Sequence, residues 1–174
     1  MAHPRTIALG LGSSLGDRHR TLALTIARLR VTPGIRVERV SHWVRTPPLA
    51  GGHARNWFLN GVARLRTTWD PHELLDLCIH LEAAAGRRRG LFWADRPLDL
   101  DILVVGHEAI DTQRLTVPHP AIRARRFVLE PLLEIWPDVM DARTGRPYGG
   151  DPAAAGIQPA LAGLLARTRR LRYL

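Results

Sequence analysis

The sequence contains no lysine. Its 25 strongly basic side chains are all arginine, and with 16 acidic side chains they give a formal net charge of +9. Without lysine the chain cannot form a Walker A loop, the ATP-binding site of a protein kinase, a lysine Schiff base or a Ser-Lys dyad. Any phosphate group that it binds must therefore be held by arginine, by backbone amides or by a metal ion.

Cysteine and long apolar runs are also scarce. The single Cys78 excludes an intramolecular disulfide framework and a cysteine zinc site, and it is predicted to belong to the core of its helix. No segment approaches the roughly 18 apolar residues of a membrane span, and glycines interrupt the apolar start of the chain, which makes it a poor signal peptide. We therefore expect a soluble cytoplasmic protein, a monomer without a membrane partner.

The size and composition are those of one folded domain. The chain has 174 residues, of which 45% are hydrophobic and 24% charged. We expect the domain to span residues 1–140, and a C-terminal extension rich in glycine, proline and alanine, residues 141–174, to pack on it. The positive charge has two interpretations: an anionic partner such as a nucleotide or nucleic acid, or the arginine-rich codon usage of a G+C-rich genome.

Hydrophobic periodicity predicts the order strand-helix-strand-strand-helix-strand. This order is typical of the split βαβ, or ferredoxin-like, arrangement. We therefore predict an α+β fold with a βαββαβ core, in which an antiparallel sheet has its helices packed on one face and leaves the other open for ligands. The expected strands are 6–11, 35–44, 56–68 and 98–105, the expected helices are 17–30 and 70–85, and a further helical segment is expected at 125–136.

Two carboxylates stand close together in the last predicted strand. Asp99 and Asp101 are two residues apart, so their side chains project from the same face, about 7 Å apart at the backbone. Paired carboxylates on an apolar strand are costly unless a cation lies between them. Mg²⁺ is the natural candidate, because it binds one or two carboxylates together with substrate phosphates. The alternative is a solvated strand edge with arginine partners.

An arginine-rich loop leads into this strand. Arg87, Arg88, Arg89 and Arg96 supply guanidinium groups that match phosphate oxygens, and Trp93 is suited to stack on a base. A solvated charge run is the simpler interpretation of the loop alone. Its position directly before the two aspartates favours a site for a metal ion and a triphosphate.

Two further features are weaker. The glycines between Gly10 and Gly16 do not match the dinucleotide-binding fingerprint, and we predict a strand-helix turn at Gly12–Gly16. His119 lies between two prolines, which hold it rigidly and exclude it from the core of a helix.

Together these motifs resemble the hydroxymethyl-dihydropterin pyrophosphokinases of the folate pathway. The resemblance covers about residues 6–138, and its pieces occur in the order of the family. They are IALGLGSSLGD at 7–17, RTPPL at 45–49, FLN at 58–60, E-x-x-x-G-R at 82–87, R-x-x-D-L-D-I-L at 96–103, RLTVPHP at 114–120 and R-x-F-V-L-x-P-L at 125–132.

The resemblance implies an activity and a site. The family transfers pyrophosphate from ATP, its co-substrate, to the hydroxymethyl group of the dihydropterin and releases AMP. By resemblance, Asp99 and Asp101 hold two Mg²⁺ ions, and Arg87 and Arg96 act with them in catalysis. The implied nucleotide-binding residues are Glu82, Arg89, Trp93, Arg114, Thr116, His119 and Arg125. The implied pterin-binding residues are Thr46, Pro47, Leu49, Phe58, Asn60 and Phe127.

The sequence departs from the family pattern in the arginine-rich loop. Where the family has a basic residue before the tryptophan and Gly-Pro after it, this chain has Phe92-Trp93-Ala94-Asp95. Asp95 adds a negative charge beside Arg96, which affects loop closure and the turnover rate. A diverged member that binds pterin or nucleotide without turnover is therefore a second hypothesis.

A basic ferredoxin-like RNA-binding module is a third hypothesis. The third predicted strand lacks the aromatic pattern that stacks bases, and the aspartate pair would repel a phosphate backbone. We therefore expect small-molecule substrates and no nucleic-acid partner.

Overall fold

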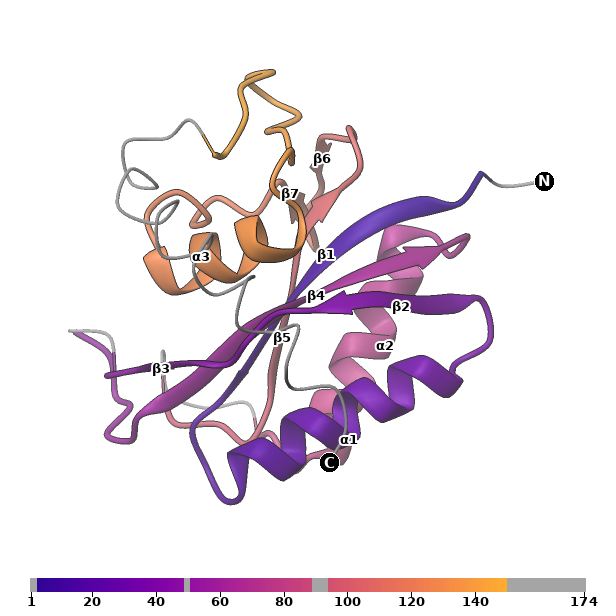
Figure 1. Ribbon diagram of the computed structural model, residues 1–174. Coiled ribbons are helices and arrows are strands. Elements are labelled where there is room, and N and C mark those ends of the chain that lie inside the picture. Colours follow the sequence, from indigo (N-terminus) through magenta and orange to yellow (C-terminus); the bar gives the residue numbers. More distant parts are fainter. Residues whose placement is uncertain (1–2, 49–50, 89–93, 150–174) are drawn as a thin grey trace, which may run out of the picture.

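The computed structural model describes residues 3–48, 51–88 and 94–149. Its main sheet is antiparallel, with the strand order β2-β4-β1-β5, and β3 pairs with the other end of β4 (Figure 1). This is the strand order of a ferredoxin-like βαββαβ core, so the predicted fold class is confirmed. The strands are β1 (Arg5–Ser13), β2 (Ile35–Val40), β3 (Val44–Thr46), β4 (Phe58–Thr67) and β5 (Asp99–Val105).

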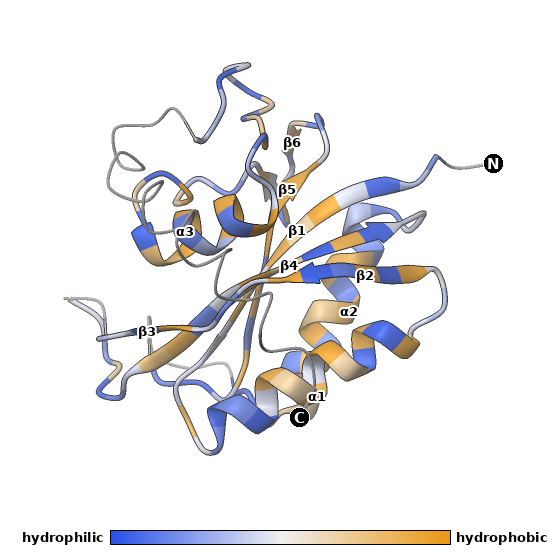
Figure 2. Ribbon diagram, viewed as in Figure 1, coloured by the Kyte–Doolittle hydropathy of each residue, from blue (hydrophilic) through white to orange (hydrophobic). Residues whose placement is uncertain are grey.

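Helices lie on both faces of the sheet. The two core helices, α1 (Arg18–Val31) and α2 (Pro71–Ala84), pack on one face as predicted, and Cys78 is buried there (Figure 1). A third helix, α3 (Arg126–Ile135), follows the core and packs on part of the opposite face, against β4. Apolar residues concentrate in the strands and on the helix sides that lie against them (Figure 2). The second face is therefore open only where α3 does not cover it.

Short elements precede and follow α3. A small sheet of β6 (Ile110–Asp111) and β7 (Thr116–Val117) precedes α3. After α3, Tyr148 is 2% exposed and joins the core between α3 and the sheet. No described helix has the length and hydropathy needed to cross a membrane.

The start of α2 is a capping box. The Asp70 carboxylate accepts a hydrogen bond from the His72 backbone N–H (2.8 Å), and the Glu73 carboxylate accepts one from the Asp70 backbone N–H (2.9 Å). Pro71 occupies the first helical position, where it needs no hydrogen-bond partner. Both side chains thus pair with backbone donors that the helix cannot satisfy.

We expect Asp70→Ala to lower the free energy of unfolding by about 1 kcal/mol, the usual cost of losing an N-cap. Urea denaturation followed by circular dichroism measures this change. Asp138→Ala is the matched control, because Asp138 is exposed and lies outside the helix caps. Equal stability of the two variants would contradict the capping role.

The single strand predicted at 35–44 is interrupted. β2 ends at Val40 and β3 begins at Val44. The Trp43 ring packs over Gly61, where a Cβ atom would lie only 2.5 Å from the ring, and the Ser41 hydroxyl accepts a hydrogen bond from the Val62 backbone N–H (2.9 Å). These contacts across β4 fix the break between the two strands.

Val104 departs from the strict alternation of β5. Strict alternation puts it on the same face as Leu100 and Ile102, but a bulge at Leu103 shifts the register between β1 and β5. Val104 therefore packs with α3 on the opposite face, while Leu100 and Ile102 remain in the core under α1 and α2. The carbonyl of the bulged Leu103 accepts a hydrogen bond from the His119 backbone N–H (2.8 Å).

Candidate active site

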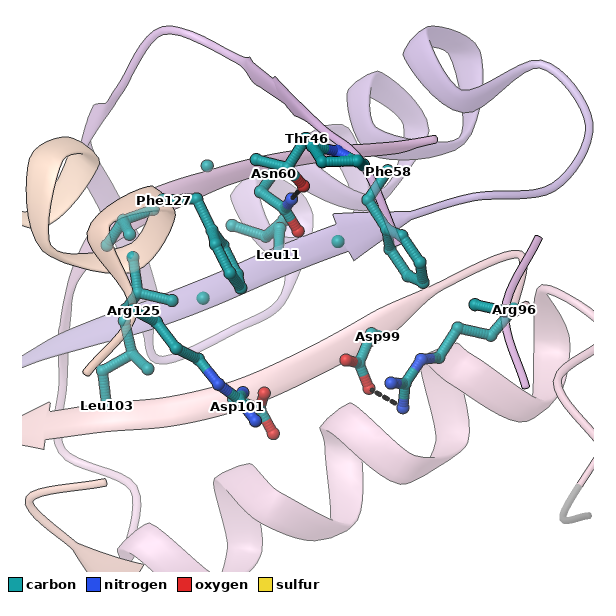
Figure 3. Close-up of a pocket in the computed structure, with 17 residues that line it drawn as sticks. Leu11, Thr46, Phe58, Asn60, Arg96, Asp99, Asp101, Leu103, Arg125 and Phe127 are labelled. Atoms are coloured by element: carbon teal, nitrogen blue, oxygen red, sulfur yellow. Dashed lines mark hydrogen bonds and ion pairs between the residues drawn. The ribbon is translucent and has the colours of Figure 1, made fainter. Parts of the chain in front are cut away.

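A cleft of about 710 Å³, open solvent at its mouth included, lies on the sheet face that carries α3 (Figure 3). Strands β1, β3, β4 and β5, the start of α3 and the neighbouring loops line it. The lining residues are Gly10, Leu11, Gly12, Thr46, Pro47, Ala54, Phe58, Asn60, Gly61, Val62, Arg96, Asp99, Asp101, Leu103, Arg125, Phe127 and Val128.

Two glycines of β1 keep the floor of the cleft flat. Gly12 lies between Asn60 of β4 and Asp99 of β5, and Gly10 pairs with Asp101. A Cβ atom on Gly12 would approach the Asn60 Oδ1 atom to 3.0 Å. The prediction of a turn beginning at Gly12 is therefore wrong, because β1 continues to Ser13. Glycine at alternate positions of a strand was the sequence signal for a surface that something approaches closely.

Asp99 and Asp101 project into the cleft from the same face of β5, as their spacing predicts (Figure 3). The Asp99 Oδ1 atom accepts hydrogen bonds from Arg87 Nη1 (2.6 Å) and Arg96 Nη1 (3.1 Å). The arginine partners that the sequence left as an alternative are thus present at Asp99. Asp99 therefore forms ion pairs with both predicted catalytic arginines.

Asp101 has a different environment. Burial raises its pKa, the Asp99 charge raises it further, and His119, Arg96 and Arg125 oppose the shift. Among the described residues, no group donates a hydrogen bond to its carboxylate; Arg125 points toward it from the start of α3 (Figure 3). A half-buried carboxylate with no hydrogen-bond donor in the described part of the chain favours a bound cation, because an unpaired charge is costly in such a place.

Glu82 of α2 contacts the backbone of β5. Its carboxylate accepts a hydrogen bond from the Leu100 backbone N–H (2.7 Å) and forms an ion pair with Arg87. Burial raises the pKa of Glu82, and the Leu100 N–H and the Arg87 charge limit the shift. Glu82 thus orients Arg87 toward Asp99, although it does not line the cleft.

The other end of the cleft is an aromatic slot. Phe58 at the start of β4 and Phe127 in the first turn of α3 stand on either side of it, with Asn60 on the floor between them (Figure 3). The Asn60 Nδ2 atom donates a hydrogen bond to Thr46 Oγ1 (2.8 Å), which fixes the amide, and Pro47 lies alongside. Two aromatic faces and an oriented amide suit a flat heteroaromatic ring with polar edges.

Several predicted nucleotide residues lie away from this cleft. Arg114 forms an ion pair with Asp76 on the exposed side of α2. Thr116 and His119 line a separate hollow beside β7. The His119 Nδ1 atom accepts a hydrogen bond from the Ala121 backbone N–H (3.1 Å). Three predicted residues lie outside the described part of the chain: Leu49, Arg89 and Trp93.

Sequence reasoning missed Ser14. This buried residue follows β1, and its backbone N–H donates to the Arg96 carbonyl (2.9 Å) while its hydroxyl accepts from the Arg96 backbone N–H (2.9 Å). Ser14 thereby fixes the backbone of a predicted catalytic arginine to the end of β1. The pairing depends on residues 82 positions apart, and no local pattern reports it.

The described residues contain no group of three or more His, Cys, Asp or Glu side chains placed to hold a metal ion. A cation at Asp99 and Asp101 would therefore need further oxygen ligands from a substrate. The fold and the cleft together suit a small-molecule enzyme, because the aromatic slot fits a flat ring and the neighbouring arginines fit an anionic group.

The comparisons with known proteins agree with that class. The family model of 7,8-dihydro-6-hydroxymethylpterin-pyrophosphokinase matches residues 8–137. A 2-amino-4-hydroxy-6-hydroxymethyldihydropteridine pyrophosphokinase of Methylorubrum extorquens is 44% identical over 132 residues, 76% of this chain and 83% of the relative. The enzyme of the same name from Bacillus subtilis is 40% identical over 127 residues, 73% of this chain and 75% of the relative.

The chain therefore belongs to the 7,8-dihydro-6-hydroxymethylpterin-pyrophosphokinase family. It is a transferase, a pyrophosphokinase of folate synthesis. A crystal structure of HPPK-DHPS in complex with substrates matches the fold with a TM-score of 0.67 at 12% identity. That match covers 93% of this chain and 45% of the other, so the chain spans less than half of that protein, and the likeness concerns the fold alone.

Proposed function

We propose that the protein transfers the pyrophosphoryl group of ATP to 6-hydroxymethyl-7,8-dihydropterin and that it uses Mg²⁺ ions held by Asp99 and Asp101. The observation that carries this proposal is the presence of an aromatic slot and a carboxylate pair in one cleft. The substrate hydroxyl oxygen attacks the β-phosphorus, the bond from that phosphorus to the α-β bridging oxygen breaks, AMP leaves, and the hydroxyl proton passes to solvent.

The aromatic slot supports the proposal that the pterin binds at this end of the cleft. Phe58 and Phe127 would cover the two faces of the ring, and the Asn60 amide would bind its polar edge. The hydrogen bond from Asn60 to Thr46 holds the amide in one orientation before the ligand arrives. This preorganisation reduces the entropy lost on binding.

The phosphate end is supported by the carboxylates and arginines. Asp99 and Asp101 fit Mg²⁺ because they are adjacent oxygen donors and because Asp101 accepts no hydrogen bond from the described residues. Two bound ions would neutralise the triphosphate and polarise the β-phosphorus. Arg87 and Arg96 supply the guanidinium groups that replace lysine at this site.

The remaining predicted contacts belong to the nucleotide side. Arg125 lines the cleft next to Asp101 and is suited to bind a phosphate. The resemblance assigns the other nucleotide contacts to Glu82, Arg114, Thr116 and His119, and to the loop residues Arg89 and Trp93. We further propose that the enzyme acts as a monomer in the cytoplasm.

The AMP yield tests the proposed function. Purified protein with Mg²⁺, ATP and 6-hydroxymethyl-7,8-dihydropterin should give AMP in a 1:1 ratio to pterin diphosphate, measured by liquid chromatography. Omission of the pterin or chelation of Mg²⁺ should abolish AMP formation. Formation of ADP, or the absence of nucleotide consumption by folded protein, would overturn the proposal.

Asp95 bears on the hypothesis of a diverged, inactive member. Its carboxylate accepts hydrogen bonds from the Arg55 and Asn56 backbone N–H groups rather than pairing with Arg96. Arg96 thus keeps its charge available toward Asp99 and the cleft. This arrangement favours the active enzyme.

We expect Gly12→Ala to weaken pterin binding by about tenfold while the fold survives. Its methyl group would crowd the Asn60 Oδ1 atom at 3.0 Å, and the cost corresponds to about 1.4 kcal/mol of lost complementarity. Asp138→Ala is the control, because Asp138 is exposed and is not part of the cleft lining. Fluorescence titration with pterin measures both, and equal affinities would contradict the role of Gly12 as the floor.

A further inference from the structure

Asp95 joins two segments that lead into the cleft, one carrying Phe58 and the other Arg96. Its Oδ2 atom accepts hydrogen bonds from the Arg55 backbone N–H (3.0 Å) and the Asn56 side-chain Nδ2 (2.9 Å). Its Oδ1 atom accepts a third from the Asn56 backbone N–H (3.1 Å). One carboxylate therefore satisfies three donors of a segment about 40 residues away in the sequence.

These hydrogen bonds favour the charged carboxylate. Burial alone would raise the pKa of Asp95, but the Arg55 and Asn56 backbone N–H groups, with Ser14 and the Asn56 side chain, lower it. The bonds are therefore charge-assisted at neutral pH, and bonds of this kind are stronger than those between neutral groups.

The segment on the first side leads into the aromatic slot. Asn56 precedes Phe58 by two residues, and Trp57 between them is fixed from two directions. The Arg18 Nη1 atom donates a hydrogen bond to the Trp57 carbonyl (2.7 Å), and the Arg45 guanidinium lies 4.6 Å from the centre of the Trp57 ring. Because only Trp57 separates Asn56 from Phe58, a shift of the Asn56 backbone would also move the start of β4, where Phe58 lies.

The segment on the second side leads into the phosphate end. Arg96 follows Asp95 directly. Ser14 forms hydrogen bonds with the Arg96 backbone, and the Arg96 side chain donates a hydrogen bond to Asp99. The Asp95 carboxylate is thus one residue from the proposed catalytic arginine and, through Asn56, two residues from the proposed pterin stack. It is the direct hydrogen-bonded link between these two segments among the described residues.

We propose that Asp95 is a positioning residue that couples pterin binding at Phe58 to the placement of Arg96 at the phosphates. The inference rests on the proposed function. Pterin packed against Phe58 orders the Arg55–Asn56 segment, the Asp95 bonds carry that order to Arg96, and nucleotide binding acts in the reverse direction. Coupling between two binding sites is reciprocal by thermodynamic necessity.

The test measures pterin affinity with and without nucleotide. Full-length protein is titrated with 6-hydroxymethyl-7,8-dihydropterin by calorimetry, alone and with saturating Mg²⁺ and α,β-methylene-ATP, which does not react. In the wild type we expect the nucleotide to tighten pterin binding by at least about fivefold. Asp95→Ala should remove most of this increase and lower kcat, while its affinity for the nucleotide alone stays within about twofold of the wild type.

Two variants of the Arg55–Asn56 segment distinguish a loss of coupling from a general loss of folding or binding. Arg55→Ala is the matched control, because Asp95 binds the backbone of Arg55 and not its side chain, so coupling should match the wild type. Asn56→Ala removes one of the three bonds and should give an intermediate coupling. This graded loss keeps the proposal testable even where Asp95→Ala unfolds, and Asp95→Glu, which keeps the charge, should recover part of the coupling.

The outcomes are distinct. Wild-type coupling in folded Asp95→Ala, or unaltered coupling in Asn56→Ala, would overturn the role of Asp95. So would a wild-type enzyme that turns over without any coupling. A wild type that binds neither substrate and forms no AMP would instead overturn the proposed function.

Discussion

Asp101→Asn is expected to lower kcat by at least about a hundredfold, because loss of one charge-stabilising group has effects of this size. The protein is expected to stay folded. The substitution keeps the shape of the side chain and removes the negative charge that the proposed Mg²⁺ site needs. Because Asp101 projects into the cleft without a hydrogen-bond donor among the described residues, few contacts within the protein are lost. Activity and stability should therefore separate.

The raised pKa of Asp101 predicts the direction in which Asp101→Asn changes the stability of the protein. Burial, and then the Asp99 charge, raise the pKa of Asp101, so the folded protein binds a proton there more tightly than the unfolded chain does. Wild-type stability should accordingly fall as pH rises from the ordinary aspartate range through the raised pKa. Asparagine removes this fall, and thermal unfolding at pH 7 should occur at a temperature no lower than in the wild type.

Steady-state AMP formation and a thermal unfolding scan on the same preparation measure the two effects. Asp138→Asn is the matched control, since Asp138 is exposed and far from the cleft lining, and both of its properties should equal the wild type. Near-wild-type turnover of Asp101→Asn would remove Asp101 from the metal site. A large loss of stability would show that the carboxylate is structural.

Arg96→Ala should lower kcat by about a hundredfold and change pterin affinity by less than about threefold. The guanidinium of Arg96 donates its hydrogen bond to Asp99 rather than to a residue of the slot between Phe58 and Phe127. Its loss therefore removes charge stabilisation of the transferring group but leaves the pterin contacts in place. The hydrogen bonds of Ser14 to residue 96 use the backbone and survive the substitution.

Kinetics and pterin titration of the same variant separate the two effects. Arg28→Ala on the exposed side of α1 is the control, because it removes the same charge from a position outside the cleft. If pterin affinity falls as much as kcat, Arg96 is a ground-state contact rather than a catalytic group. A control variant with reduced kcat would show that net charge is responsible.

Local chemistry allowed much of the fold to be predicted. The capping box at Asp70 begins α2, and the i, i+2 spacing of Asp99 and Asp101 places both side chains on the cleft face. Both depend only on neighbours in the sequence and on strand geometry. The strand order followed from the succession of elements, because few arrangements satisfy it.

The features that sequence reasoning missed depend on contacts between distant segments. Trp43 packing on Gly61 breaks the second strand, and the bulge at Leu103 reverses the side on which Val104 packs. The sequence shows that Asp95 adds a negative charge next to Arg96, but it does not show that Asp95 binds Arg55 and Asn56, about 40 residues away. None of these partners follows from periodicity, because each is chosen by three-dimensional packing.

The structure shows which arginines lie where a lysine-free chain needs cations to bind phosphate. Arg87 and Arg96 meet at Asp99, and Arg125 lines the same cleft, so guanidinium groups supply the cations of the proposed phosphate site. Arg114 instead pairs with Asp76 at the surface. The charge of +9 is therefore no evidence for a nucleic-acid partner, and only a few arginines are assigned to the chemistry.

The fate of the β-phosphorus tests pyrophosphoryl transfer most directly. With ATP labelled by ³²P in the β-phosphate, Mg²⁺ and 6-hydroxymethyl-7,8-dihydropterin, the label should appear in the pterin diphosphate, with unlabelled AMP as the other product. The label should stay in ATP with Asp101→Asn. Label recovered in ADP would indicate transfer of a single phosphoryl group, and label recovered in free pyrophosphate would indicate hydrolysis; either result would contradict the proposed reaction.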